Sequence, residues 1–160
     1  MDIVFITDNN YAFPTKIAIK SLIKNKNETT KYNIHIICVE LNDENLKNLA
    51  TLKTLDKNVS IDIIMKASIY ADVQAHAYVS RSALYKFQLA NIFNNLDKIL
   101  YLDSDIIVEK DLSDLFDIDL ENLYAAVVSD HWSIQFMNTN GRINHKDYFN
   151  SGIMLLNLKK

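Results

Sequence analysis

Short apolar runs and amphipathic segments alternate along the first half of this chain. Each apolar run has the length and the β-branched content of a buried strand, and the segments between them have the apolar period of a helix. The predicted strands are residues 2–7, 31–40 and 59–65, and the predicted helices are residues 14–26, 42–55 and 81–93. Strands that alternate with helices favour a mostly parallel sheet with helices on both faces, because parallel neighbours need long crossover connections. The chain is therefore predicted to be an α/β protein.

The segment from Lys98 to Glu109, KILYLDSDIIVE, carries the strongest functional signal. Its first apolar run predicts a buried strand, and that run stops at Asp103 and Asp105. Ligands of open α/β sheets bind where strands end, and side chains two apart in an extended backbone point to the same side. Two unpaired carboxylates there would repel each other, and a divalent cation would remove that repulsion. We therefore expect Asp103 and Asp105 to bind a metal ion.

The same spacing of acids occurs a second time, at Asp117 and Asp119. No buried strand precedes this second pair, which follows Leu115 and Phe116 in an acidic, loop-like segment. We therefore expect a structural role for the second pair and a metal-binding role for the first only.

Composition excludes several classes of function. The chain has 160 residues, 49% of them hydrophobic, and a net charge of −3, which is typical of one globular domain and disfavours a general nucleic-acid surface. No apolar stretch reaches the roughly 18 residues of a membrane span, and the chain starts directly in a predicted strand. Its one cysteine, Cys38, lies in a predicted strand and is expected to be a packed, inert thiol. The predicted location is the cytoplasm, with a peripheral position at the membrane as the alternative.

Glycine is scarce, with only Gly141 and Gly152. Loops that bind phosphates through backbone N–H groups need glycines at close spacing, and none is possible before residue 141. If the chain binds a nucleotide, another group must neutralise the phosphates, and a cation on Asp103 and Asp105 could do so.

Polar side chains also follow other predicted strands. The cluster Thr7–Tyr11 either caps the next helix, which Pro14 would suit, or contacts a base and a ribose. Predicted strand 123–129 ends at Asp130, and the last apolar run, 149–158, is interrupted by Asn150-Ser151-Gly152. In the predicted helix that Ser80 caps, Lys86 is either a solvated basic residue or a contact for an anion held by the acids.

Three segments of the chain resemble glycosyltransferase family 8, whose members are retaining enzymes with the GT-A fold and use nucleotide sugars. They are DIVFITDNNYAFPTKIAIKSL at the start, KILYLDSDIIVEKDLSDLFDIDL in the middle and DYFNSGIMLLNLKK at the end. The resemblance spans the whole chain in the order of the family. It implies a mixed, mostly parallel Rossmann-like sheet and a transfer of hexose from UDP-glucose or UDP-galactose to a saccharide or lipooligosaccharide acceptor.

The resemblance also implies roles for individual residues. Asp103 and Asp105 would bind Mn²⁺, or Mg²⁺, which bridges the diphosphate. Ser104 and Asn10 would lie near the ribose, Asp8 would accept from the uracil, and Tyr11 would stack on it. The further contacts implied are Thr7 at the nucleotide, Lys86 at the diphosphate or donor sugar, and Asn150 and Asp130 at the sugar and acceptor side. A hard cation held by carboxylates suits the charge that develops on a leaving diphosphate.

Relatives in this family continue past the point that matches Lys160 and supply a further acidic pair and a late histidine. None of His35, His76, His131 and His145 lies in such a motif. Residues 1–160 are therefore predicted to form a single donor-binding domain, the amino-terminal portion of the enzyme, truncated at the C-terminus. The sheet edge left uncovered predicts self-association.

Two other interpretations remain from the residues alone. A phosphohydrolase of the haloacid dehalogenase type also has Asp-x-Asp after a buried strand, but it expects Thr or Val where Ile107 stands. A UDP-sugar-binding fragment without turnover is the non-enzymatic alternative. No nucleophile for a covalent sugar intermediate is evident, so the catalytic residue stays unassigned.

Overall fold

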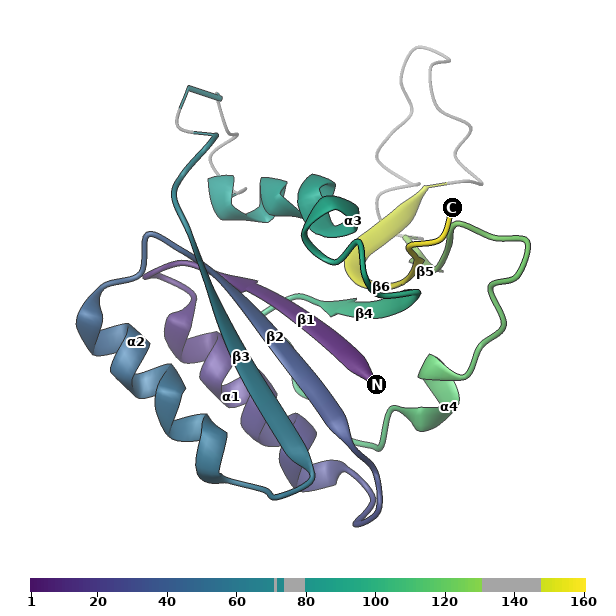
Figure 1. Ribbon diagram of the computed structural model, residues 1–160, viewed down its shortest axis with the longest axis horizontal. Helices are drawn as coiled ribbons and strands as arrows, with labels where there is room; N and C mark the ends of the chain where they lie inside the picture. The colour runs from purple at the N-terminus through teal and green to yellow at the C-terminus, as the bar shows by residue number, and fades with distance from the viewer. Residues whose placement is uncertain (71, 74–79, 131–147) are drawn as a thin grey trace.

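A computed structural model describes residues 1–70, 72–73, 80–130 and 148–160 of the chain. They form one six-stranded sheet with the strand order β3-β2-β1-β4-β6-β5 (Figure 1). The strands are β1 (Asp2–Thr7), β2 (Tyr32–Val39), β3 (Val59–Lys66), β4 (Lys98–Leu102), β5 (Ala125–Ser129) and β6 (Phe149–Asn157). Three of the histidines named above, His76, His131 and His145, lie outside the described residues.

The sheet is mixed and mostly parallel, as predicted. Strand β1 pairs in parallel with β2 on one side and with β4 on the other, and β2 pairs in parallel with β3. Strand β6 then runs antiparallel beside β4, and β5 runs antiparallel beside β6. The carboxyl ends of β1 and β4 therefore lie at the same end of the sheet, together with the amino end of β6.

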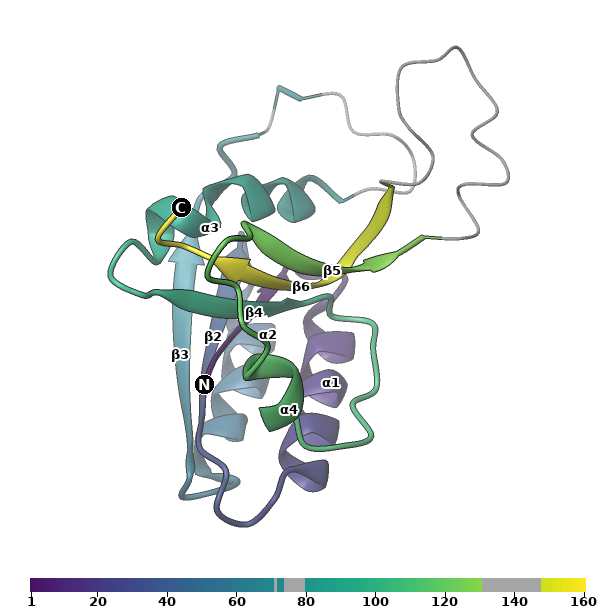
Figure 2. The same cartoon turned by 90° about the vertical axis from the view of Figure 1, so that its right-hand side faces the viewer.

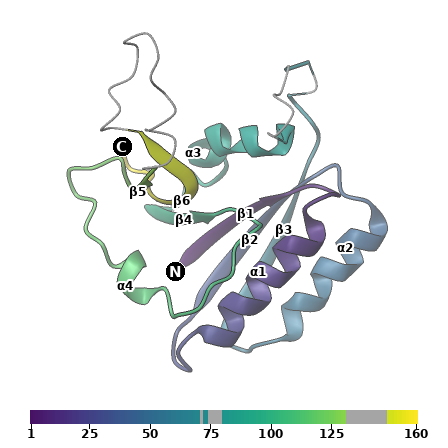
Figure 3. The same ribbon diagram turned by 180° about the vertical axis from the view of Figure 1, so that it is seen from behind.

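Helices cover both faces, which also confirms the prediction. Helices α1 (Ala12–Asn25) and α2 (Asp43–Ala50) lie on one face, and η2 (Arg81–Gln88) and α3 (Leu89–Ile92) lie on the other (Figures 1 and 3). The alternation of side chains along β1 accounts for the two cores. Ile3 and Phe5 pack with α1, whereas Val4 and Ile6 pack with Tyr85 of η2.

Two predicted helices contain 3₁₀ turns. Residues 42–55 form α2, which Asn42 caps by accepting from the Asn45 N–H, and then the 3₁₀ helix η1 (Thr51–Thr54). Most of the predicted helix 81–93 is the 3₁₀ helix η2, which Ser80 caps as expected. A 3₁₀ helix has three residues per turn, so Ser82 and Tyr85 share its buried side. An α-helical period would place Phe87 on the same apolar face as Ala83 and Leu84, but its side chain is 78% exposed.

The segment after β4 differs most from its prediction. The strand ends at Leu102, Ser104 and Asp105 form a turn, and residues 106–108 do not resume a strand. The backbone of Val108 is bonded by side chains of α1: its N–H donates to the Ser21 hydroxyl, and its carbonyl accepts from the Asn25 amide. These side chains replace the strand neighbour that the apolar run alone suggested. Cys38 is buried as predicted, and burial raises the pKa of its thiol to about 12.

Strand β5 forms one edge of the sheet, beside β6 (Figure 2). Its side chains Val127 and Val128 are 40% and 53% exposed. An exposed apolar edge is the feature on which the predicted self-association depends, and that prediction stays open. None of the described helices has the length and apolar content to cross a membrane.

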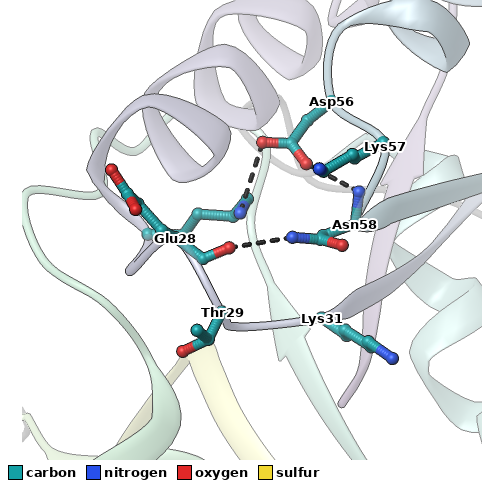
Figure 4. Close-up of a pocket in the computed structure, with 7 residues that line it drawn as sticks. Glu28, Thr29, Lys31, Asp56, Lys57 and Asn58 are labelled. Atoms are coloured by element: carbon teal, nitrogen blue, oxygen red, sulfur yellow. Dashed lines mark hydrogen bonds and ion pairs between the residues drawn. The ribbon is translucent and has the colours of Figure 1, made fainter.

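A polar cavity lies at the amino ends of β2 and β3, at the opposite end of the sheet from Asp103 (Figure 4). The Lys26 ammonium lies 3.2 Å from Asp56 Oδ2, and the Asn58 side chain donates to the Glu28 carbonyl at 2.8 Å. The Asn58 backbone N–H also donates to Asp56, and this hydrogen bond is the main cause that lowers the pKa of that carboxyl. These contacts join the loops that lead into the two strands.

Asp111 fastens the short helix α4 (Ser113–Phe116) to the loop before β2. Its carboxylate accepts from the Asn27 N–H at 2.8 Å, from the Tyr32 hydroxyl at 3.2 Å, and from both the N–H and the hydroxyl of Ser113. Partial burial acts to raise the pKa of this carboxyl, but these hydrogen bonds outweigh it and hold the pKa well below its usual range. The charged form is therefore the one that stabilises the fold.

Asp111→Asn is expected to lower the free energy of unfolding by about 1–3 kcal/mol at neutral pH, because a charged acceptor of several hydrogen bonds is lost. Since the folded pKa lies below the unfolded value of about 3.9, this contribution is present above that pH and is lost as the pH falls toward the folded value. Urea denaturation of both proteins at neutral pH and at about pH 3 measures the difference, which should shrink in acid.

The control is Asp114→Asn, which removes one exposed carboxylate from the same helix. If both variants were equally stable at neutral pH, the role of Asp111 would be wrong.

Candidate functional site

A cavity of about 290 Å³ lies where the carboxyl ends of β1 and β4 meet the amino end of β6. Both acids that the sequence singled out, Asp103 and Asp105, line it, and so do Tyr11, Lys86 and Ser104. Its other lining residues are Ile6, Ser80, Ser82, Ala83, Tyr101 and Ser151. The fold thus brings five of the predicted site residues to one cavity.

Asp103 has a fixed position beside β6. Its backbone N–H donates to the Gly152 carbonyl at 2.7 Å, which extends the ladder between β4 and β6 by one residue. Its Oδ1 accepts from the Tyr101 hydroxyl at 2.6 Å and lies 3.0 Å from the Lys86 ammonium. Burial, and then the nearby Asp103 carboxylate, raise the pKa of the Tyr101 phenol far above its ordinary value, so Tyr101 remains a donor.

Lys86 reaches the cavity from η2 and is not a solvated surface residue. Its side chain is 16% exposed, and besides Asp103 its ammonium contacts the Ser151 carbonyl at 3.0 Å and the Ser151 hydroxyl at 3.3 Å. It also lies 4.7 Å from the centre of the Tyr101 ring, within the range of a cation–π contact. The ammonium therefore lies among a carboxylate, two oxygen atoms of Ser151 and an aromatic ring.

An irregularity in β6 positions the residues that meet Asp103 and Lys86. The pairing of β5 with β6 jumps from Val127–Met154 to Val128–Asn150, so the residues between them bulge out of the ladder. A Cβ on Gly152 would lie 2.8 Å from Asp103 Oδ2 and 2.9 Å from Asn150 Oδ1. Glycine is therefore needed here for close approach, and Asn150 uses that oxygen to accept from the Gly152 N–H.

The described lining of the cavity offers two carboxylates to a divalent cation. Asp103 and Asp105 supply hard oxygen donors, which suit Mn²⁺ and Mg²⁺. Within the described residues, no three His, Cys, Asp or Glu side chains are grouped so that they could hold a metal. Mg²⁺-type sites commonly use one or two carboxylates and complete the shell with water and substrate phosphates. The two acids fit that kind of site.

A buried hydroxyl network holds the turn that carries the acids. The Thr15 hydroxyl lies 2.8 Å from the Ser104 hydroxyl, 2.8 Å from the Thr7 hydroxyl and 2.7 Å from the Tyr11 carbonyl. Ser104 donates in turn to the Ile6 carbonyl at 2.9 Å. The hydroxyls of Ser104 and Thr7, both expected at a nucleotide, are therefore engaged inside the protein. Thr15 was missed by sequence reasoning, since a lone threonine in an amphipathic helix has no distinctive signal.

Asp8 connects the end of β1 to the start of η2. One carboxylate oxygen accepts from the hydroxyls of Ser80 and Ser82, at 2.5 and 2.8 Å, and the other accepts from the backbone N–H groups of Asn10 and Tyr11. Asp8 thus organises the turn before α1, but the helix-cap interpretation is wrong in detail, because Tyr11 is the N-cap residue of α1 and no side-chain hydrogen bond caps this helix. Both serines line the cavity, and their role was not predicted because their partner is more than 70 residues away.

The described lining of the cavity lacks five of the ten predicted residues, four of which are Thr7, Asp8, Asn10 and Asp130. Asp130 follows β5, and its N–H donates to the Tyr148 carbonyl at 3.2 Å. Asn150 does not line it either. Its side chain is hydrogen-bonded to Gly152, which in turn is hydrogen-bonded to the lining residue Asp103. Ser151 also lines the cavity. No role was predicted for it, although the polar segment 150–152 was noted as an interruption of the last apolar run.

The second acid pair lies elsewhere. Asp117 ends helix α4, and Asp119 accepts from the Glu121 N–H at 2.9 Å in an exposed turn. The neighbouring carbonyls of Phe116 and Ile118 accept from Lys98, which is the first residue of β4. This pair is therefore at the opposite end of β4 from Asp103 and does not line the cavity.

Comparison with known proteins identifies the family of the chain. The model of Glycosyl transferase family 8 matches residues 2–160. A lipopolysaccharide 1,2-glucosyltransferase of Escherichia coli is 31% identical over 158 residues, which cover 96% of this chain and 46% of that protein.

Two crystal structures of LgtC have the same fold. One is the galactosyltransferase in complex with donor and acceptor sugar analogs, with a TM-score of 0.85 and 28% identity, which covers 100% of this chain and 59% of LgtC. The other, an active-site mutant, has a TM-score of 0.87 and 28% identity, and covers 100% of this chain and 58% of LgtC.

The predicted GT-A fold is therefore confirmed, and the phosphohydrolase alternative is wrong. The chain spans about half the length of the curated relatives that it matches. The match to the family model extends over almost every residue, and the cavity lies where the sheet brings the two acids together. The chain belongs to glycosyl transferase family 8.

Proposed function

We propose that this chain is the donor-binding part of a metal-dependent glycosyltransferase. It would bind a UDP-sugar, UDP-glucose or UDP-galactose, and transfer the hexose to a saccharide or lipooligosaccharide acceptor with retention of configuration. The observation that carries the proposal is the convergence of Asp103, Asp105 and Lys86 on one cavity. The names of the similar proteins, a lipopolysaccharide glucosyltransferase and a galactosyltransferase with donor and acceptor analogs, support the substrate classes.

The charges of the cavity suit a sugar diphosphate. A divalent cation on Asp103 and Asp105 would act as a Lewis acid on the diphosphate that leaves the sugar. Lys86 adds a positive charge on the same side, next to the Ser151 carbonyl. Tyr11, 40% exposed at the rim, offers a ring on which a uracil can stack.

Sugar and acceptor contacts are proposed for Asn150 and Asp130, at the ends of β6 and β5. Nucleotide contacts remain proposed for Thr7, Asp8, Asn10 and Ser104. The side chains of Thr7, Asp8 and Ser104 also have hydrogen-bond partners within the protein. For Asp8 this means that a uracil donor would share the carboxylate with Ser80 and Ser82. The cytoplasmic location also stays a prediction.

A binding fragment without turnover is the second candidate. It is favoured by the small number of metal ligands, since the described residues offer two carboxylates at the cavity and no larger cluster. A loosely held cation would permit binding of a UDP-sugar yet stabilise the leaving diphosphate poorly.

UDP release separates the two candidates. We expect incubation with UDP-glucose or UDP-galactose and Mn²⁺ to release UDP, and removal of the metal by EDTA to stop the release. A binder would instead show stabilisation of the fold by the UDP-sugar in a thermal shift assay without any UDP product. If neither sugar nucleotide gave release of UDP or stabilisation of the fold, both candidates would be contradicted.

Asp103→Asn is expected to weaken Mn²⁺-dependent binding of UDP by at least about tenfold, because a charged oxygen ligand is replaced by a neutral amide. Isothermal titration of UDP at fixed Mn²⁺ measures the affinity. Asp117→Asn is the matched control, since it makes the same change in the second acid pair and should leave UDP binding as in the wild type. Equal losses in both variants would remove the argument from position.

Gly152→Ala is expected to disturb the same carboxylate from the other side. The new Cβ forces Asp103 Oδ2 or Asn150 Oδ1 away, and an off-rotamer side chain costs about 0.5–1.5 kcal/mol. If this cost falls on the bound state, the affinity for UDP in the presence of Mn²⁺ falls by a factor of about two to ten. Thermal unfolding without ligand serves as the control for folding. A variant that binds UDP as tightly as the wild type would show that the close approach has no functional role.

A further inference from the structure

Lys86 is paired with the carboxylate on which the proposed cation would bind. Its ammonium lies 3.0 Å from Asp103 Oδ1, and the Tyr101 hydroxyl donates to the same oxygen. The other oxygen, Oδ2, faces the backbone of Gly152 and would lie 2.8 Å from a Cβ there. A divalent cation on Asp103 therefore either shares the carboxylate with Lys86 or displaces it.

Sharing would be unfavourable because the cavity is partly buried. Like charges repel more strongly where protein excludes water, and Lys86 is only 16% exposed. Its other contacts, to the carbonyl and hydroxyl of Ser151 and to the ring of Tyr101, are neutral and leave its charge uncompensated. In the protein without ligand, the Lys86–Asp103 pair thus satisfies both charges.

We propose that Lys86 is an internal counter-ion which makes metal binding depend on the diphosphate. A metal alone must break the ion pair and leave the Lys86 ammonium beside a second positive charge. A diphosphate that arrives with the metal offers Lys86 a new anion, which its flexible stem can reach by a small movement. This inference rests on the proposed function and assigns Lys86 a role in coupling two ligands, beyond that of a contact to one.

The coupling has a measurable sign. If Lys86 opposes the metal and favours the diphosphate, its removal tightens the binding of metal alone and reduces the factor by which the metal improves binding of UDP. A lysine that only contacts the diphosphate would leave the affinity for metal alone unchanged. A lysine that merely supports the fold would lower both affinities together.

The test is titration of Mn²⁺ into the nucleotide-free protein, followed by free-Mn²⁺ electron paramagnetic resonance, for the wild type and Lys86→Met. We expect Mn²⁺ to bind the variant on the order of fivefold more tightly. Titrations of UDP with and without Mn²⁺ then give the coupling factor, which should fall by a similar ratio. Lys86→Gln repeats the comparison with a polar side chain in case the methionine variant folds poorly.

Lys98→Met is the matched control. Lys98 begins the same strand, donates to backbone carbonyls and lies 4.8 Å from the centre of the Phe116 ring, so its loss removes one positive charge at the far end of β4. Its affinity for Mn²⁺ should equal that of the wild type, and Lys86→Arg, which keeps the charge, should resemble the wild type as well.

Unchanged or weaker binding of Mn²⁺ by both neutral Lys86 variants would overturn the inference while leaving the proposed function intact. A comparable gain in Lys98→Met would also overturn it, because the effect would then reflect net charge. Absence of Mn²⁺ and UDP binding in the wild type would overturn the proposed function and the inference together.

Discussion

The acidic turn depends on one buried hydroxyl, that of Thr15. This hydroxyl joins the end of β1, the first turn of α1 and Ser104 in the turn after β4, a residue 89 positions away in the chain. Parallel pairing aligns β1 with β4 over Ile3 and Val4 only, so the hydrogen bonds beyond the ladder decide where the turn lies. Buried hydroxyls that lose their partners are costly, and the network therefore has little freedom to shift.

The rest of the cavity comes from an irregular strand. Were β6 paired regularly with β5 throughout, Ser151 and Gly152 would belong to a flat ladder. The bulge instead lets Ser151 meet Lys86 while Gly152 lies against Asp103. One anion and one cation are thus positioned by the same short segment, which explains why a small tripeptide interrupts an otherwise apolar strand.

Much of the fold could be predicted because it follows from local patterns. Runs such as residues 36–39 are apolar on both faces, and only a sheet covered by helices on each side buries them. The pair Asp103–Asp105 could be singled out from Asp117–Asp119 because the strand before it is buried. What failed was the detail that local period cannot supply: the 3₁₀ helix that turns Phe87 outward, and the turn that replaces an extended backbone at the acids. In both places contacts with distant residues outweighed local preference.

Apolar period and charge placement are local properties, so they were enough to predict the strands, the order of helices and strands, and which acids lie at a strand end. The pairs of side chains that share a hydrogen bond or an ion pair depend instead on how the elements pack together. The serines that bind Asp8, the threonine that holds Ser104 and the pairing of Lys86 with Asp103 all join segments that are far apart in the chain. Their geometry arises when the sheet and its helices pack together, because these polar side chains then become buried and need hydrogen-bond partners within about 3 Å.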